Sequence, residues 1–185
     1  MMFRGSGGGT RGPQAGVGDG TSAEARCDRP RRVRYLGPVP EFDGPKGLIY
    51  NTEPIADPEG FAREAGAASW LYLCGEEFAS MEGGMSYEQV EGAVPEAARV
   101  VSDPPREMTM DLARRQLAAL EGLPRPTLVT CRKGPRSSAL AYLYAGLESG
   151  ASAGEVLARA ETDGAPFAAN EGLRAWVAQG LDELA

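Results

Sequence analysis

The chain has 185 residues, 42% of them hydrophobic, and this size suits one domain with its own core better than two. Its formal net charge of -7 disfavours nucleic acid or an anionic membrane as the main partner, because both are negatively charged. The absence of histidine excludes Ser-His-Asp hydrolysis, a Cys-His protease pair and histidine-containing zinc sites. We therefore expect one functional site, no nucleic-acid or membrane partner, no metal and no other cofactor.

Residues 1–30 contain eight glycines in their first twenty positions and few large apolar side chains, which predicts a disordered leader. Whether this leader has a targeting role stays open. The cysteines Cys27, Cys74 and Cys131 are odd in number and widely spaced, which does not suggest the disulfide framework of a secreted domain. We expect a soluble protein under reducing conditions, in the cytoplasm or in an organelle lumen.

Short strands and a helix are predicted in the first half of the remaining chain. Val33–Leu36 and Gly47–Tyr50 are predicted to be extended and are separated by prolines. A short helix is expected over Phe61–Ala68, followed by a buried strand over Ser69–Leu73. Ala97–Val101 is expected to be another strand, which a run of turn residues ends.

Helices dominate the second half. An amphipathic helix is predicted over Met110–Leu120, and a strand over Thr127–Thr130. Leu140–Leu147 shows helical spacing, Ser152-Ala-Gly-Glu155 is a capping box that opens another helix, and Leu173–Leu184 is the last helix. Alternating strands and helices predict an α/β fold in which helices cover a mostly parallel sheet, with residues 31–185 as a single domain.

The segment 131–136 joins a predicted strand to a predicted helix. Such a loop gathers backbone N–H groups around one point and adds the positive end of the helix dipole, which favours an anion. Cys131 begins the loop, and the nearby cations Arg132, Lys133 and Arg136 favour its reactive thiolate. Gly134 lets the backbone approach a bound oxyanion closely, and Arg136 can offer it two parallel donors. We expect Cys131 and Arg136 to form the functional site.

The sequence Thr-Cys-Arg-Lys-Gly-Pro-Arg-Ser-Ser resembles the active loop of the cysteine-dependent phosphatase superfamily. It resembles more closely the dual-specificity-phosphatase-like domain of bacterial beta-lactamase hydrolase-like proteins. The resemblance runs from about Tyr35 to Glu161 and is strongest over Leu123–Ala160. It implies a phosphatase-like three-layer α/β/α fold and the hydrolysis of phosphate monoesters. The expected partner is a phosphorylated small molecule or a phosphoprotein.

The same resemblance implies a role for each residue of the site. Cys131 would be the nucleophile that forms a cysteinyl-phosphate, Arg136 the oxyanion clamp and Ser137 the hydroxyl that assists thiolate departure. Asp103 or Asp111 would donate the proton to the leaving group, although either carboxylate could instead cap a turn or a helix. The loop residues expected to contact substrate are Arg132, Lys133, Gly134 and Pro135.

Two features keep other functions open. Thr130 stands where phosphatases usually have a histidine, and four residues rather than five separate Cys131 from Arg136. The shorter loop also resembles that of rhodaneses, sulfurtransferases whose cysteine carries a persulfide. The alternatives are therefore a rhodanese-like sulfurtransferase acting through a Cys131 persulfide and a catalytically weak anion-binding regulatory module.

Cys74 also follows a predicted strand. The carboxyl ends of parallel strands meet at one edge of a sheet, so Cys74 could lie near Cys131. A small apolar core residue is the simpler interpretation. The sequence leaves open whether Cys74 is a redox partner of Cys131.

Overall fold

The computed structural model describes residues 41–81, 84–102 and 108–185. Within these residues, four strands form one fully parallel sheet in the order β1-β4-β2-β3. The strands are β1 (Leu48–Tyr50), β2 (Ser69–Tyr72), β3 (Glu96–Arg99) and β4 (Thr127–Thr130). The predicted leader, the predicted strand Val33–Leu36, Cys27 and Asp103 lie outside the described residues.

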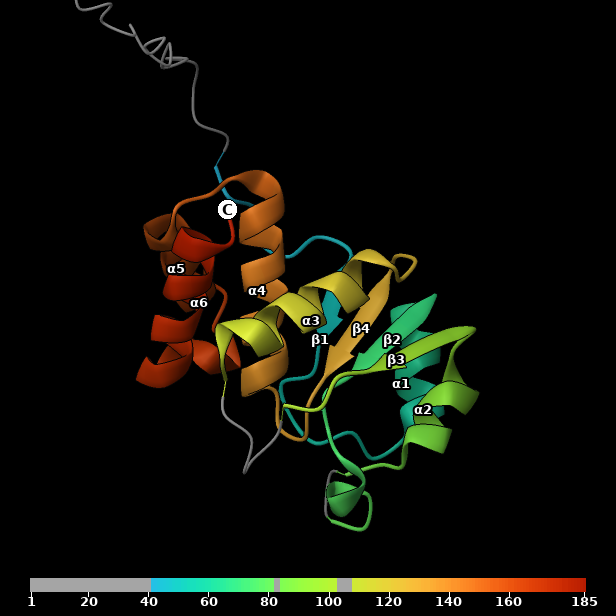
Figure 1. The fold of residues 1–185 in the computed structure, drawn as a ribbon. Coiled ribbons are helices and arrows are strands. Elements are labelled where there is room, and N and C mark those ends of the chain that lie inside the picture. Colours follow the sequence, from blue (N-terminus) through green and yellow to red (C-terminus); the bar gives the residue numbers. More distant parts are fainter. Residues whose placement is uncertain (1–40, 82–83, 103–107) are drawn as a thin grey trace, which may run out of the picture. The chain divides into compact units, whose positions relative to one another are not determined.

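Helices cover both faces of this sheet (Figure 1). One face carries α1 (Pro58–Ala65) and α2 (Tyr87–Ala93), which pack on each other. The other face carries α3 (Met110–Glu121), α4 (Pro135–Ser149), α5 (Ala153–Thr162) and α6 (Glu171–Glu183). Two short 3-10 helices are η1 (Glu76–Phe78) and η2 (Pro166–Ala169). The predicted α/β architecture with a helix-covered parallel sheet is confirmed.

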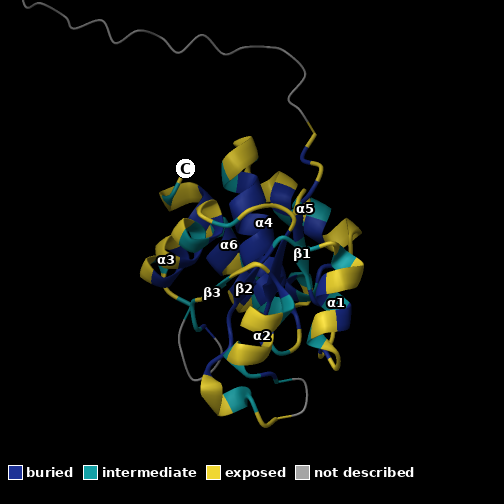
Figure 2. Cartoon of the chain, turned by 90° about the vertical axis from the view of Figure 1, so that its right-hand side faces the viewer, coloured by how far each residue is buried: buried dark blue, intermediate teal, exposed yellow. Residues whose placement is uncertain are grey.

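The core is centred on β2, β4 and α4 (Figure 2). All residues of α4 from Ser137 to Gly146 are buried, because the helix lies between the sheet and α5 and α6. Its contact with α6 is close: a Cβ atom added at Gly146 would lie 2.7 Å from Leu181, and one at Gly180 would lie 2.7 Å from Leu143. The small residues therefore let α4 and α6 approach each other.

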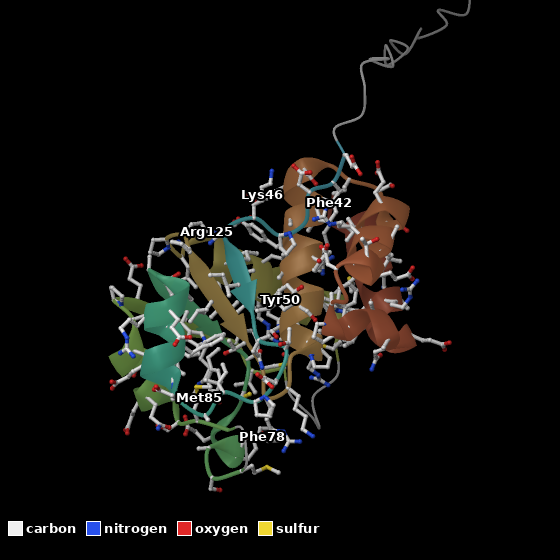
Figure 3. The ribbon with its side chains drawn as sticks, turned by 180° about the vertical axis from the view of Figure 1, so that it is seen from behind. Phe42, Lys46, Tyr50, Phe78, Met85 and Arg125 are labelled. Carbon is white, nitrogen blue, oxygen red and sulfur yellow. The ribbon has the colours of Figure 1, made fainter. Side chains whose placement is uncertain are left out.

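An aromatic cluster fixes the segment before β1 against α4. The ring of Tyr142 lies 6.1 Å from that of Phe42, 6.0 Å from that of Tyr50 and 5.5 Å from that of Phe167, between centroids. Figure 3 shows Phe42 and Lys46 near the start of β1 and Phe78 near the opposite end of the sheet. The hydroxyl of Tyr142 donates to Asp163 Oδ2 at 2.5 Å. This cluster links the segment before β1, β1 itself, α4, the end of α5 and η2.

Several predicted boundaries shift by a few residues. The first helix begins earlier, at Pro58, because Asp57 caps it by accepting from the N–H of Gly60. The capping box at Ser152 and Glu155 is present. Helix α2 was not predicted, although Ser86 and Gln89 form a second capping box at its start. In the described part of the chain, no helix is long and apolar enough to cross a bilayer.

Candidate active site

Cys131 directly follows β4, and α4 begins four residues later. The cysteine loop, residues 131–136, comprises the four connecting residues and the first two residues of α4. Gly134 is the N-cap of α4 and has a φ of 104°, a conformation that side chains rarely adopt. A Cβ atom at this position would lie 2.4 Å from the carbonyl oxygen of Asn51. Glycine is therefore required here by both backbone conformation and space.

The thiol of Cys131 is buried, with the residue 3% exposed, and has donors around its sulfur. The N–H of Gly134 donates to Sγ at 3.2 Å. The Oγ of Ser137, in the first turn of α4, lies 3.6 Å from Sγ. Because the positive end of the α4 dipole also points at this position, a bound anion is favoured here.

A cavity of about 480 Å³ opens beside the thiol. From the cysteine loop it is lined by Cys131, Arg132, Lys133, Pro135 and Arg136. From elsewhere in the chain it is lined by Met108, Asn170, Gly172 and Leu173. The structure thus brings three cations to Cys131 in a chain whose formal net charge is -7, and no carboxylate among the described residues lines this cavity. Such a site attracts a small anion.

The remaining predicted site residues lie in different places. Gly134 faces the sulfur with its N–H, and Ser137 lies behind the thiol in the first turn of α4. Asp111 is exposed in the first turn of α3, forms an ion pair with Arg115 at 3.4 Å and does not line the cavity. Its position fits a carboxylate that stabilises a helix start. Asp103 lies outside the described residues, so its role as general acid stays a prediction.

Asn51 is a central residue of the site that the sequence did not suggest. It directly follows β1 and is 2% exposed. Its Nδ2 donates to the carbonyl of Cys131 at 2.8 Å, and its Oδ1 accepts from the N–H of Cys131 at 3.1 Å. The same Oδ1 lies 2.9 Å from Ser137 Oγ. The only sequence signal was its place directly after a predicted extended segment, where ligand-binding residues of parallel sheets collect.

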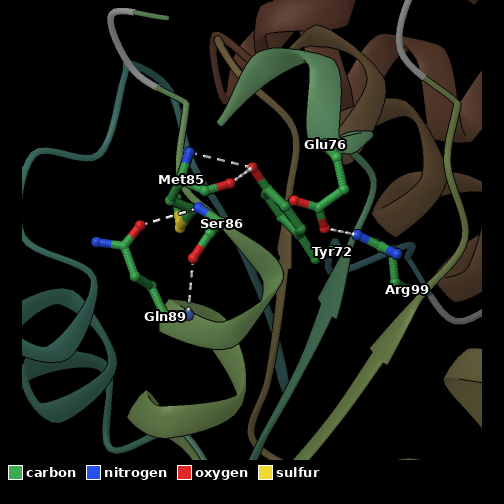
Figure 4. A network of polar contacts seen from close by, with 6 residues as sticks. All are labelled: Tyr72, Glu76, Met85, Ser86, Gln89 and Arg99. Carbon is green, nitrogen blue, oxygen red and sulfur yellow. Dashed lines mark hydrogen bonds and ion pairs between the residues drawn. The ribbon is translucent and has the colours of Figure 1, made fainter. Parts of the chain in front are cut away.

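The loop after β2 lies next to the cysteine loop. Cys74 is buried there, and the guanidinium of Arg132 lies 5.9 Å from the ring centroid of Phe78. Figure 4 shows how this region is held. Tyr72 donates its hydroxyl to the carbonyl of Met85 at 2.8 Å, and Glu76 pairs with Arg99. The end of β2, β3 and the start of α2 are thereby linked.

The 3-10 helix η2 supports the cysteine loop from the other side. The N–H of Phe167 donates to Ser138 Oγ at 3.2 Å, and Ser138 Oγ lies 2.9 Å from the carbonyl of Gly134. The segment then leads into Asn170, whose side chain caps α6 by accepting from the N–H of Leu173. The support of the cysteine loop and the far wall of the cavity therefore belong to one continuous stretch of chain.

No protein-family model matches the sequence, and no curated protein matches it. Similar structures do exist. The core catalytic domain of the PP-IP phosphatase SIW14 from S. cerevisiae, solved with citrate, has a TM-score of 0.54 and 17% identity, over 75% of this chain and 81% of that chain. A second structure, of the Siw14 catalytic core, gives a TM-score of 0.50 and 16% identity, over 74% and 79% of the two chains. The chain therefore has a phosphatase-like fold, the one that these two catalytic domains share.

Proposed function

We propose that this protein hydrolyses phosphate monoesters through a cysteinyl-phosphate on Cys131. One observation carries the proposal: a buried thiol lies 3.2 Å from a backbone N–H and 3.6 Å from a hydroxyl, at the start of a helix and beside three cations. These groups stabilise a thiolate and the negative charge of a phosphoryl group in transfer. The SIW14 core, which is named a phosphatase, has a similar fold, and this supports phosphatase activity.

The first step of the proposed reaction forms the phosphoenzyme. The thiolate of Cys131 attacks phosphorus, an S–P bond forms, and the P–O bond to the leaving group breaks. Arg136 lines the cavity with Cys131, where its planar guanidinium can bind two phosphoryl oxygens. The leaving oxygen takes a proton from a general acid, a role for which the phosphatase resemblance suggests Asp103.

The second step releases phosphate. Water attacks the phosphorus of the cysteinyl-phosphate, the S–P bond breaks, and sulfur leaves as a thiolate. Ser137 can donate its hydroxyl to this thiolate, because its Oγ already lies 3.6 Å from Sγ. The N–H of Gly134 supplies a second donor to the same sulfur.

A small phosphorylated molecule is the favoured class of substrate. Arg132 and Lys133 line the cavity in addition to the proposed clamp, Arg136, so more than one anionic group can be neutralised. The far wall, formed by Asn170, Gly172 and Leu173, encloses the cavity from the side of α6. SIW14 is itself named for PP-IP substrates, and its structure contains citrate, which has three carboxylates. A phosphoprotein remains the second class of substrate.

Sulfur transfer is a second candidate reaction, and one specific observation favours it. Only four residues separate Cys131 from Arg136, and a tighter ring of donors leaves less room for a pentavalent phosphoryl group than for one added sulfur atom. Sulfur from a donor such as thiosulfate would then be carried as a persulfide on Cys131. The resemblance beyond the loop, through Ser137, Ser138 and the start of α5, favours the phosphatase.

Paired assays test the choice. We expect hydrolysis of an aryl phosphate, abolished in Cys131→Ser, and an intact mass that gains one phosphoryl group after trapping. The parallel assay measures transfer of sulfur from thiosulfate to cyanide with the same variant as control. Sulfur transfer without phosphate hydrolysis would overturn the proposal, and inactivity in both assays would favour an anion-binding module.

A further inference from the structure

We propose that Asn51 is the positioning residue of this site. Its side-chain amide holds the main chain of Cys131, the proposed nucleophile. Its Oδ1 and the Cys131 sulfur are alternative acceptors for the hydroxyl proton of Ser137. The inference rests on the proposed function for its catalytic meaning. Its structural basis is the set of contacts that join the end of β1 to the cysteine loop, 80 residues away in sequence.

The orientation of the Asn51 amide is determined by its partners. Backbone N–H groups can only donate and carbonyl groups can only accept. Oδ1 faces the N–H of Cys131 at 3.1 Å, while Nδ2 faces the carbonyls of Cys131 and Glu53 at 2.8 and 2.9 Å. A flipped amide would place donor against donor and acceptor against acceptor. Ser137 Oγ, 2.9 Å from Oδ1, must therefore be the donor in that contact.

Ser137 has one hydroxyl proton and three acceptors within reach. These are Asn51 Oδ1 at 2.9 Å, the carbonyl of Gly134 at 2.9 Å and Cys131 Sγ at 3.6 Å. While the cysteine is a thiol, its S–H can donate to Ser137 Oγ, and the hydroxyl points at an oxygen. When the sulfur becomes a thiolate it can only accept, so the hydroxyl turns towards it.

Asn51 keeps the free-energy cost of this hydroxyl rotation low. Its Oδ1 keeps the N–H of Cys131 after the hydroxyl has left, so no buried acceptor loses its last partner. Its Nδ2 meanwhile holds the carbonyl of Cys131, which keeps the Cys131 main chain in place beside the first turn of α4. By holding this main chain, Asn51 keeps the sulfur within reach of the Ser137 hydroxyl and so favours the thiolate without touching the substrate.

Replacing Asn51 by alanine leaves the charged groups around Cys131 unchanged. Arg132, Lys133 and Arg136 line the cavity from the cysteine loop. Among the described residues, the carboxylates on the surrounding segments are Glu53 beyond Asn51, Glu76 and Glu77 on η1, and Glu171 in the first turn of α6. None of them is altered by Asn51→Ala, so a change in thiolate reactivity in that variant reports the hydrogen bonds.

Alkylation of Cys131 by iodoacetamide is the measurement, because only the thiolate reacts and no substrate is needed. Rates are compared at about pH 6.5 and about pH 9.5, the latter one unit above the ionisation of an ordinary cysteine. In Asn51→Ala we expect alkylation of Cys131 to slow about tenfold at the lower pH and less than about twofold at the higher pH. Peptide mapping confines the measurement to Cys131.

The double variant isolates the role of Ser137. Ser137→Ala alone should slow alkylation several-fold at the lower pH, whereas in the Asn51→Ala background the same substitution should change it by less than about twofold. Equal effects of Ser137→Ala in both backgrounds would overturn the proposal. So would an Asn51→Ala rate that falls equally at both pH values, since that indicates a purely structural role.

Gln116→Ala is the matched control. Gln116 is fully buried, its amide has no hydrogen-bond partner in the described part of the chain, and it does not line the cavity. Its truncation measures the effect of a lost buried amide, and we expect the alkylation rates to stay within about twofold of the native protein.

If Asn51→Ala does not fold, Asn51→Asp replaces it. While it is protonated, the introduced carboxyl should make hydrogen bonds like those of the amide. Once it is ionised, it should hold the hydroxyl proton of Ser137 and so keep that proton from the sulfur.

For Asn51→Asp, the ratio of variant to native alkylation rate should then fall as pH rises. A ratio that is constant with pH would overturn the proposal. Failure of the native protein to hydrolyse phosphate esters would disprove the proposed function alone, because every alkylation measurement is made without substrate.

Discussion

Cys131 Sγ and Ser137 Oγ lie 3.6 Å apart across the start of α4, and both are buried. The separation is set by the chain itself, because Ser137 is in the first turn of the helix that the cysteine loop opens. A hydroxyl at this distance is a weak partner for a thiol and a stronger one for a thiolate. The contact therefore matters most when sulfur carries charge.

Ser137→Ala should slow the second chemical step more than the first. Loss of one hydrogen bond to a charged leaving group is worth about 1.5–3 kcal/mol, or about ten- to hundredfold in rate. We expect a burst of phenol release from an aryl phosphate, followed by slow turnover, and a phosphorylated enzyme in the intact mass. Rapid-quench kinetics would measure the two phases.

Ser138→Ala is the control for this prediction. Ser138 is equally buried, but its Oγ bonds main-chain groups, the carbonyl of Gly134 and the N–H of Phe167, rather than the sulfur. We expect lower stability without a burst. A burst of the same size in Ser138→Ala would assign the effect to loop stability.

Arg136→Lys should reduce kcat/KM far more than Arg132→Lys. A lysine keeps the charge but cannot offer two parallel donors to an oxyanion, and the loss of such a clamp costs about a hundredfold or more. Arg132 lies over the ring of Phe78 at 5.9 Å, where a lysine can preserve most of the attraction, so we expect less than about threefold. Equal losses would show that only net charge acts on the substrate.

Local signals were sufficient to predict much of this fold. The strand Thr127–Thr130 has the predicted bounds, because an apolar β-prone run lies between two groups of turn residues. The capping box at Ser152 is also confirmed. It could be predicted because Ser152 and its partner Glu155 are only three residues apart in sequence. The cysteine loop was found because its cysteine, glycine and cations are contiguous in sequence.

The rest of the site depends on contacts between distant segments. Asn51 meets Cys131 only because β1 and β4 are adjacent in the sheet, and no pattern in the sequence gives the strand order. Asn170 and Gly172 reach the cavity through the packing of α6 on α4. Helix α2 was missed because it has seven residues and buries only Val90 of its apolar side chains, which leaves little periodicity to detect.

Gly134→Ala should destabilise the protein and abolish activity. The new Cβ would lie 2.4 Å from the carbonyl oxygen of Asn51, at a φ that already disfavours alanine. We expect the free energy of unfolding to fall by at least about 2 kcal/mol. Gly164→Ala is the matched control, since Gly164 also has a positive φ but no atom within 4 Å of a Cβ. It should lose only about 1 kcal/mol and keep its activity, as measured by urea denaturation and phosphate release.

Tyr142 should make the protein sensitive to alkali. Its burial, together with its hydrogen bond to Asp163, raises the pKa of its phenol above the ordinary value. A tyrosine with a raised pKa in the folded state contributes stability that is complete below its unfolded pKa of about 10 and is lost as pH rises above that value. The same hydrogen bond lowers the pKa of Asp163.

Tyr142→Phe removes both the ionisation and the bond to Asp163. At neutral pH we expect the free energy of unfolding to fall by about 1–2 kcal/mol, because Asp163 loses a donor. Between about pH 10 and pH 11 the variant should lose stability less steeply than the native protein, since phenylalanine cannot ionise. Tyr144→Phe is the control: burial also raises the pKa of Tyr144, but its hydroxyl bonds Glu148 at 3.1 Å on the same helix. Urea denaturation across this range measures the slopes, and an unchanged slope in Tyr142→Phe would place the alkaline sensitivity in other residues.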